Sequence, residues 1–181
     1  MLYDLRSADV RIKWLVTCLL ATFGLSYLFG ALMVSLYAGF TPARVAATYA
    51  GPEMSMPMPP ETTVVVEHSM SMADFARPEV HAVDTNLLIQ DTHVHVPMYG
   101  VIAAALSLVV AGLSLERRWA LGLITLLFGA PWLDFAGMWL TKFATPRFAI
   151  ATLVGGWTMG AGYLVVTVLA VQQMWFSRER S

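Results

Sequence analysis

Residues 91–97 read Asp-Thr-His-Val-His-Val-Pro, and they mark the point at which a polar stretch of the chain meets a long apolar one. Two of the four histidines lie in this short segment. From Pro97 to Leu115 the sequence contains no charged side chain. An apolar helix of this length crosses about 30 Å of hydrocarbon. The segment therefore marks the entry of the chain into a membrane.

The composition of the whole chain points the same way. Hydrophobic residues make up 57% of it and charged residues 13%, which excludes an ordinary soluble domain. The apolar side chains run continuously and do not alternate, which favours helices over the strands of a membrane barrel. We predict an all-α membrane protein, a four-helix transmembrane bundle formed by a single membrane domain over residues 1–181. Its helices are expected at about residues 14–38, 97–115, 119–140 and 148–174.

Basic residues near the helix ends predict the orientation, because cytoplasmic segments of membrane proteins carry an excess of lysine and arginine. We expect both termini in the cytoplasm of a bacterium and a long, mostly irregular loop (39–96) in the periplasm. The protein would then lie in the inner (cytoplasmic) membrane. The side richer in basic residues carries Arg6, Arg11, Lys13, Arg117, Arg118, Arg178 and Arg180, and the other side carries Arg44, Arg77, Lys142 and Arg147.

The chemistry available to His93 and His95 depends on their backbone. On a helix, side chains two residues apart diverge by about 200°, whereas on an extended chain they share one face. Proline favours the first position of a helix and an extended residue before it. We therefore predict that the second helix begins near Pro97, with both imidazoles on one side of an extended entry. The alternative is a helix that begins near Asn86 and is merely kinked by Pro97, in which case each imidazole meets a different neighbour.

Asp134 is the one charged residue inside the predicted helices. A carboxylate in this position costs on the order of 3 kcal/mol, so a partner or a role is expected. It lies about 12 Å below the helix end near Lys142, close to the depth at which the second helix starts. Together with His93 and His95 it could hold zinc, copper or iron, and one histidine could instead ligate haem. The competing explanation is that Asp134 only fixes a kink or an ion pair.

A second set of candidate ligands lies in the loop, which is rich in methionine and proline. Thioethers select Cu(I), and an extended chain places alternate methionines on one face. The alternative is that these side chains make adaptable apolar contacts with a partner or with the membrane surface. The set comprises Met54, Met56, Met58, His68, Met70 and Met72.

The last predicted helix contains Gly156 and Gly160, a spacing that lets another helix or a flat cofactor approach the backbone. The net charge of −1 and the lack of a glycine-rich phosphate loop give no reason to expect nucleic acid. The sequence also lacks a nucleophile–base pair and an array of intramembrane charges. These absences argue against a hydrolase, an ion pump or a channel.

The chain resembles a poorly characterised group of bacterial four-helix membrane proteins that carry a T-H-x-H signature at the start of the second helix. The resemblance covers most of the chain except the methionine-rich segment. It implies the four-helix topology, a metal or haem link through the histidine pair, and a place beside respiratory or photosynthetic complexes. The matching residues are Thr92-His93-Val94-His95, Thr41-Pro42, Tyr49-Ala50-Gly51, Asp134, Trp139, Lys142 and Met174-Trp175.

Two functions of different class follow from these features. The chain is expected to be an accessory subunit of a redox membrane complex, without catalytic activity of its own, whose histidine pair binds a metal ion or haem. A stand-alone, periplasm-facing copper- or metal-binding membrane protein is a variant of this hypothesis. The other class is a structural subunit that braces a larger complex and binds no cofactor. The expected partners are the lipid bilayer and the other proteins of such a complex.

Overall fold

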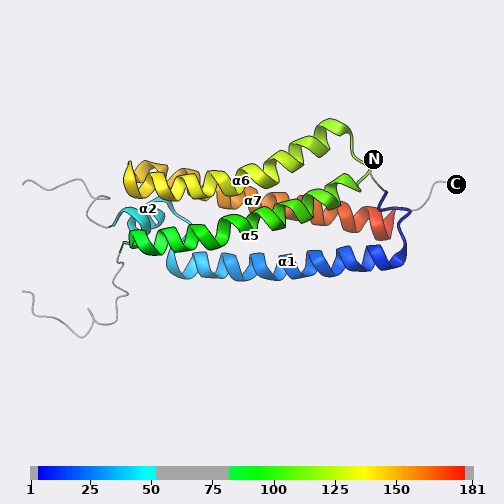
Figure 1. The fold of residues 1–181 in the computed structure, drawn as a ribbon, viewed down its shortest axis with the longest axis horizontal. Helices are drawn as coiled ribbons and strands as arrows, with labels where there is room; N and C mark the ends of the chain where they lie inside the picture. The colour runs from blue at the N-terminus through cyan, green and yellow to red at the C-terminus, as the bar shows by residue number, and fades with distance from the viewer. Residues whose placement is uncertain (1–3, 52–81, 178–181) are drawn as a thin grey trace, which may run out of the picture.

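Four long helices form an elongated bundle in a computed structural model that describes residues 4–51 and 82–177 (Figure 1). All four are long and apolar enough to cross a membrane, and no β-strand occurs in the described residues. The prediction of an all-α protein with four membrane-spanning helices is therefore confirmed. The helices are α1 (Val10–Tyr37), α5 (Thr85–Ala111), α6 (Arg117–Phe143) and α7 (Ala149–Val171), and short helical turns at Pro146–Phe148 and Gln172–Phe176 extend α7 at both ends.

Helix α5 begins at Thr85, and Pro97 lies inside it. The prediction that this helix starts near Pro97, with an extended segment before it, is wrong, and the alternative of a longer helix is confirmed. The Asp84 side chain caps the first turn by accepting from the Asn86 backbone N–H at 3.3 Å. Further along, Leu88 is 1% exposed and packs against α6. Capping and packing outweigh the one backbone hydrogen bond that a proline removes from a helix.

Helix α2 (Pro42–Ala50) occupies part of the loop that was expected to be mostly irregular. Its start follows an ordinary rule, because Thr41 supplies the N-cap oxygen and Pro42 takes a first-turn position that needs no N–H. Val45 and Ala46 are buried against Ala149 of α7. The helix thus covers one end of the bundle, which we call the α2 end; both termini lie at the opposite end (Figure 1).

The chain leaves the α2 end at Gly51 and returns to it at Ala82. A Cβ placed on Gly51 would stand 3.3 Å from the Ala82 Cβ, and the Val83 N–H donates to the Thr48 carbonyl at 2.8 Å. The Lys142 ammonium of α6 donates to the Val83 carbonyl. These bonds join both ends of the intervening segment to the bundle. The candidate ligands Met54, Met56, Met58, His68, Met70 and Met72 lie outside the described residues.

Small residues bring α6 and α7 close together. A Cβ on Gly155 would stand 2.5 Å from the Asp134 backbone nitrogen, and one on Gly162 would meet the Leu126 side chain at the same distance. By contrast, a Cβ on Gly156 or on Gly160 would meet nothing within 4 Å. The predicted role of Gly156 and Gly160 in close packing therefore stays a prediction about contacts with another chain or a cofactor.

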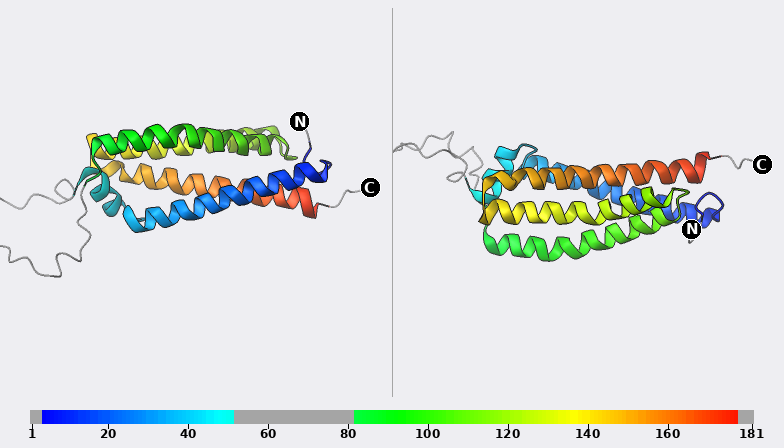
Figure 2. Two further views of the ribbon diagram at one scale, coloured as in Figure 1. Left: turned by 60° about the horizontal axis from the view of Figure 1, so that its bottom comes forward. Right: turned by 90° about the horizontal axis from the view of Figure 1, so that it is seen from above.

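Helix α1 is less tightly held, and it runs obliquely across α7 (Figure 2). Only Val16 and Leu20 are buried along its length. The Tyr163 hydroxyl of α7 donates to the Leu20 carbonyl at 2.6 Å, and the Trp175 indole donates to the Thr17 hydroxyl at 3.2 Å. The rest of α1 presents an apolar surface, as expected of a helix in lipid.

Candidate functional site

Three side chains of α5 form a polar stripe near the α2 end. Asp91, His95 and Tyr99 follow one another at intervals of four residues and therefore share one face of the helix. The His95 Nδ1 atom lies 2.9 Å from an Asp91 carboxylate oxygen and 2.9 Å from the Asp91 carbonyl oxygen. The Tyr99 ring stands 5.9 Å from the His95 ring and 5.9 Å from the Phe135 ring, measured between centroids. The stripe thus faces α6.

The contact with Asp91 determines which His95 nitrogen is free. Both oxygens beside Nδ1 can only accept a hydrogen bond, so Nδ1 carries the proton. In the neutral ring the lone pair is then on Nε2. Histidines that ligate metals commonly donate their other ring nitrogen to a carboxylate or a carbonyl in this manner, which fixes the tautomer and the ring orientation. The lone pair on His95 Nε2 is therefore the one that could coordinate a metal ion.

Asp134 approaches this stripe from α6. Its electrostatic neighbours include Asp91 and His95. The close contact between Gly155 of α7 and the Asp134 backbone of α6 fixes the position of Asp134 along α7. Among the described residues Asp134 has no ion pair with a lysine or an arginine, and Lys142 is bonded to the Val83 carbonyl instead. An ion pair of Asp134 with Lys142 or Arg147, which would explain this residue structurally, is therefore not formed in the described part of the chain.

Tyr49 of α2 lies in the same region as Asp91, His95 and Asp134. It packs on the apolar cluster formed by Leu88, Phe135 and Met138. Burial raises the pKa of Tyr49 above its ordinary value of 10.0, and the charges of Asp134 and Asp91 raise it further. Its hydroxyl therefore stays protonated beside the two carboxylates. We refer to Tyr49, Asp91, His95, Tyr99 and Asp134 as the polar cluster.

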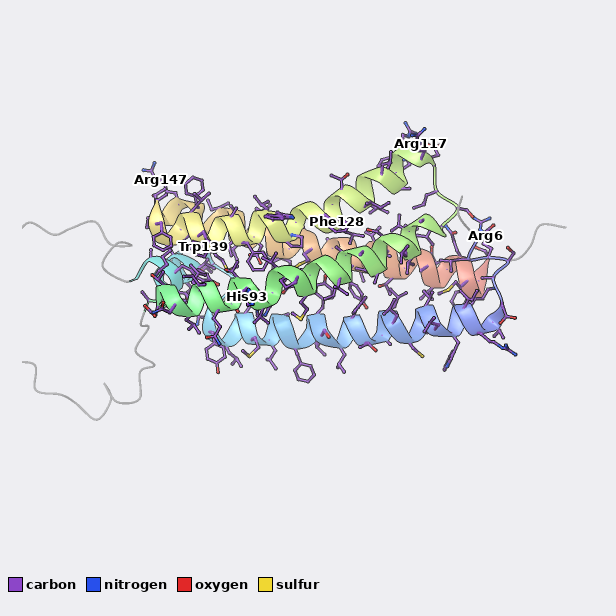
Figure 3. The ribbon with its side chains drawn as sticks, in the orientation of Figure 1. Arg6, His93, Arg117, Phe128, Trp139 and Arg147 are labelled. Atoms are coloured by element: carbon purple, nitrogen blue, oxygen red, sulfur yellow. The ribbon has the colours of Figure 1, made fainter. Side chains whose placement is uncertain are left out.

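His93 does not join the polar cluster. It is exposed on α5, in the half of the bundle toward α2 (Figure 3). On a continuous helix it diverges from His95 by about 200°. In residues 4–51 and 82–177 no group of three histidine, cysteine, aspartate or glutamate side chains is placed to hold a metal ion. The structure thus brings His95 and Asp134 into one neighbourhood and leaves His93 outside it.

One hydrogen bond between α6 and α5 stabilises the helices near the cluster. The Trp139 indole of α6 donates to the Thr92 hydroxyl at 3.0 Å, and that hydroxyl donates to the Leu88 carbonyl at 2.7 Å. No role could be assigned from the sequence to Asp91 or Tyr99, and Tyr49 was named only as a residue that matches the family pattern. The interval of four residues was a signal for the first two, but it has meaning only on a helix. Nothing local to Tyr49 indicates that α2 folds back over α6.

Comparison with known proteins identifies a family. The family model for a transmembrane helical domain (Aq_1264_TM) matches residues 39–181. The matched range includes α2, α5, α6 and α7, and with them every residue of the polar cluster. No curated protein and no solved structure matches the chain.

Proposed function

This chain belongs to the transmembrane helical domain family whose model it matches. We propose that it is a multi-pass subunit whose polar cluster holds a metal ion or a haem iron through His95. Copper, zinc and iron are the candidate metals. The subunit is an accessory part of a redox complex, respiratory or photosynthetic, in the bacterial cytoplasmic membrane. It carries out no reaction by itself.

One observation carries this proposal, namely the contact of Asp91 with His95 Nδ1 at 2.9 Å. It leaves Nε2 as the ligating atom, and imidazole is a ligand that suits copper, zinc and iron. Asp134 supplies a second, anionic ligand or a counter-charge. Two side chains from this chain leave coordination positions for water, a porphyrin or a partner subunit. This incomplete ligand set favours a site shared within a complex.

The distribution of lysine and arginine supports an orientation in which the α2 end faces the periplasm. Helix bounds place Arg6, Arg11, Lys13, Arg117 and Arg118 at the end with the termini, where α1 and α6 begin, and Arg44, Lys142 and Arg147 at the α2 end. Asp91 is 44% exposed and His95 is 36% exposed as side chains, so the cluster is partly open at the surface of the bundle near this end. Metal would then enter from the periplasmic side.

Metal content per mole of chain, measured by mass spectrometry on gently purified protein, tests the proposal. The wild type is expected to hold about one metal ion, and His95→Ala is expected to lose it. His93→Ala is the matched control, because this residue lies two positions away on the same helix and outside the cluster. Equal metal content in all three proteins would contradict the proposal. No metal above background in the wild type would also count against it.

A structural subunit without cofactor is the second candidate. The bonds of Lys142 to Val83 and of Trp139 to Thr92 favour it, because they stabilise the α2 end without any ligand. On this hypothesis the protein co-purifies with its complex in the His95→Ala form as well as in the wild type, and neither form contains metal.

A further inference from the structure

A groove of about 380 Å³ lies between α1 and α5, in the half of the bundle that carries the termini. All the side chains that line it are aliphatic. Val16 and Val109 are buried and form its floor, whereas Leu15 and Leu108 are 68% and 62% exposed and form its rims. The groove therefore opens sideways, toward the hydrocarbon around the helices. The rest of its lining consists of Ile12, Leu19 and Ala105.

The N-terminal segment closes the groove at the end of the bundle. The Leu5 N–H donates to the Gly112 carbonyl at 2.9 Å, and Gly112 lies about one helical turn beyond the rim residue Leu108. The Lys13 ammonium of α1 donates to the Arg6 carbonyl at 2.7 Å. Residues 5–9 thus cross from the end of α5 to the start of α1, and they place Arg6 at the closed end of the groove (Figure 3).

Two arginine side chains at this closed end lack a partner. Arg11 lies in the first turn of α1, four residues before the rim residue Leu15, so the two are neighbours on the helix surface. In residues 4–51 and 82–177, neither the Arg6 nor the Arg11 guanidinium has a hydrogen-bond or ion-pair partner. Guanidinium groups bind phosphate oxygens through paired hydrogen bonds. The closed end of the groove therefore suits a phosphate group.

The acidic side chains nearby do not cancel this charge. The Asp4 carboxylate accepts from the Arg6 backbone N–H at 2.9 Å, and the Asp9 carboxylate accepts from the Arg11 backbone N–H at 2.8 Å. With Lys13, three cations stand against these two carboxylates in residues 4–13. The closed end thus carries a net positive charge, which favours an anion over a neutral group.

Tryptophan side chains mark the depth of this end in the membrane. Trp14 of α1 and Trp175 beyond α7 are both exposed, and the Trp175 indole donates to the Thr17 hydroxyl at 3.2 Å. Tryptophan is concentrated at the interface between membrane and water. Arg11, which precedes Trp14 by three residues, therefore lies at the level of the lipid head groups. The groove runs from there toward the membrane centre, at the depth of the acyl chains.

We propose that this groove binds one phospholipid with an anionic head group. Arg6 and Arg11 bind its phosphate, and one acyl chain lies along the aliphatic groove between the rims. The charge at the closed end favours this occupant over a helix of a second copy, which would fill the groove and leave both guanidinium groups unpaired. The site lies at the opposite end of the bundle from the polar cluster, so it does not depend on metal at His95.

The charges are tested with the full chain, stripped of lipid in detergent and mixed with equal amounts of phosphatidylglycerol and phosphatidylcholine that carry the same acyl chains. Native mass spectrometry counts the bound lipids, and the wild type is expected to bind one phosphatidylglycerol in preference. Arg6→Gln/Arg11→Gln is expected to lower its affinity for this lipid about 25-fold, because each basic residue near an anionic lipid contributes about five-fold. Arg117→Gln/Arg118→Gln is the matched control, because these arginines begin α6 at the same end and away from α1 (Figure 3).

The groove is tested by filling it. Ala105→Leu places a larger side chain in the groove and is expected to lower phosphatidylglycerol binding about ten-fold, because it displaces about two methylene groups of the acyl chain. Ala104→Leu makes the same change at an exposed neighbour that does not line the groove, and it is expected to bind lipid as the wild type does.

Equal binding of the two lipids by the wild type would overturn the proposal. So would an equal loss in both double arginine variants, because the attraction would then be to the general charge of this end. Unaltered binding by Ala105→Leu would show that no acyl chain occupies the groove. A stable dimer that binds no lipid and is broken by Ala105→Leu would assign the groove to a second copy instead.

Discussion

Replacing Gly155 by alanine is expected to destabilise the bundle, whereas the same change at Gly156 is expected to leave its stability equal or slightly higher. A Cβ added at Gly155 would lie 2.5 Å from the Asp134 backbone nitrogen and 2.7 Å from the Asp134 Cα. These are backbone atoms, so no flexible side chain can move aside. Helix α7 would have to shift by about 1 Å relative to α6 to restore normal contact.

The expected size of the effect follows from two opposing terms. Overpacking costs about 1–3 kcal/mol, and a contact with backbone atoms belongs near the upper value. Alanine gains about 1 kcal/mol over glycine in a helix interior. The net loss at Gly155 is therefore about 2 kcal/mol, or roughly 4–8 °C in the melting temperature of a protein of this length. At Gly156 only the favourable term applies, because its Cβ meets nothing within 4 Å.

Thermal unfolding in detergent, followed by tryptophan fluorescence, measures both variants against the wild type. The Gly155→Ala shift should be accompanied by lower metal affinity, because the same contact positions Asp134. Equal melting temperatures for the two variants would refute the α6–α7 packing described here. So would a larger loss of stability at Gly156 than at Gly155.

Three further predictions concern the α2 end. Thr92→Val removes the acceptor of the Trp139 indole and should cost about 1–3 kcal/mol of unfolding free energy in a denaturant titration. Residues 52–81 can be deleted and Gly51 joined to Ala82 by a short Gly-Ser linker, because Gly51 and Ala82 already lie together. The deletion should preserve membrane insertion and the metal bound at His95. If the methionine-rich segment binds Cu(I), a copper titration of the shortened protein will show the loss of that site alone. Because burial raises the pKa of Tyr49, the folded state keeps a proton that the unfolded chain releases above about pH 10. Stability should therefore fall as pH rises past that value, and melting curves of Tyr49→Phe should show a smaller fall.

The membrane-spanning helices could be predicted from the sequence because each is a long apolar run, a property that does not depend on distant contacts. The start of α5 could not be predicted from the sequence. The rule that places proline at the first position of a helix is local, whereas here Leu88 packs on α6 and Trp139 bonds to Thr92. These contacts stabilise an additional stretch of helix before Pro97, and only the folded bundle supplies them.

The point at which α5 begins also determines which residues share a face at the candidate site. An extended entry gives His93 and His95 a common face, and a helix separates them while placing Asp91 and Tyr99 beside His95. The depth of Asp134 could be counted from the helix end, and its electrostatic neighbours in the structure do include His95. The part played by Tyr49 could not be predicted, because it depends on how α2 packs against α6 and α7.

The most direct test of the central claim is a ¹⁵N nuclear magnetic resonance spectrum of the histidine rings in bilayer-reconstituted protein, assigned with the His93→Ala and His95→Ala variants. We expect His95 to carry its proton on Nδ1 and its Nε2 signal to shift when metal is added, while the His93 signals stay unchanged. A proton on His95 Nε2, or ring signals of both histidines that do not change when metal is added, would contradict the proposed metal site.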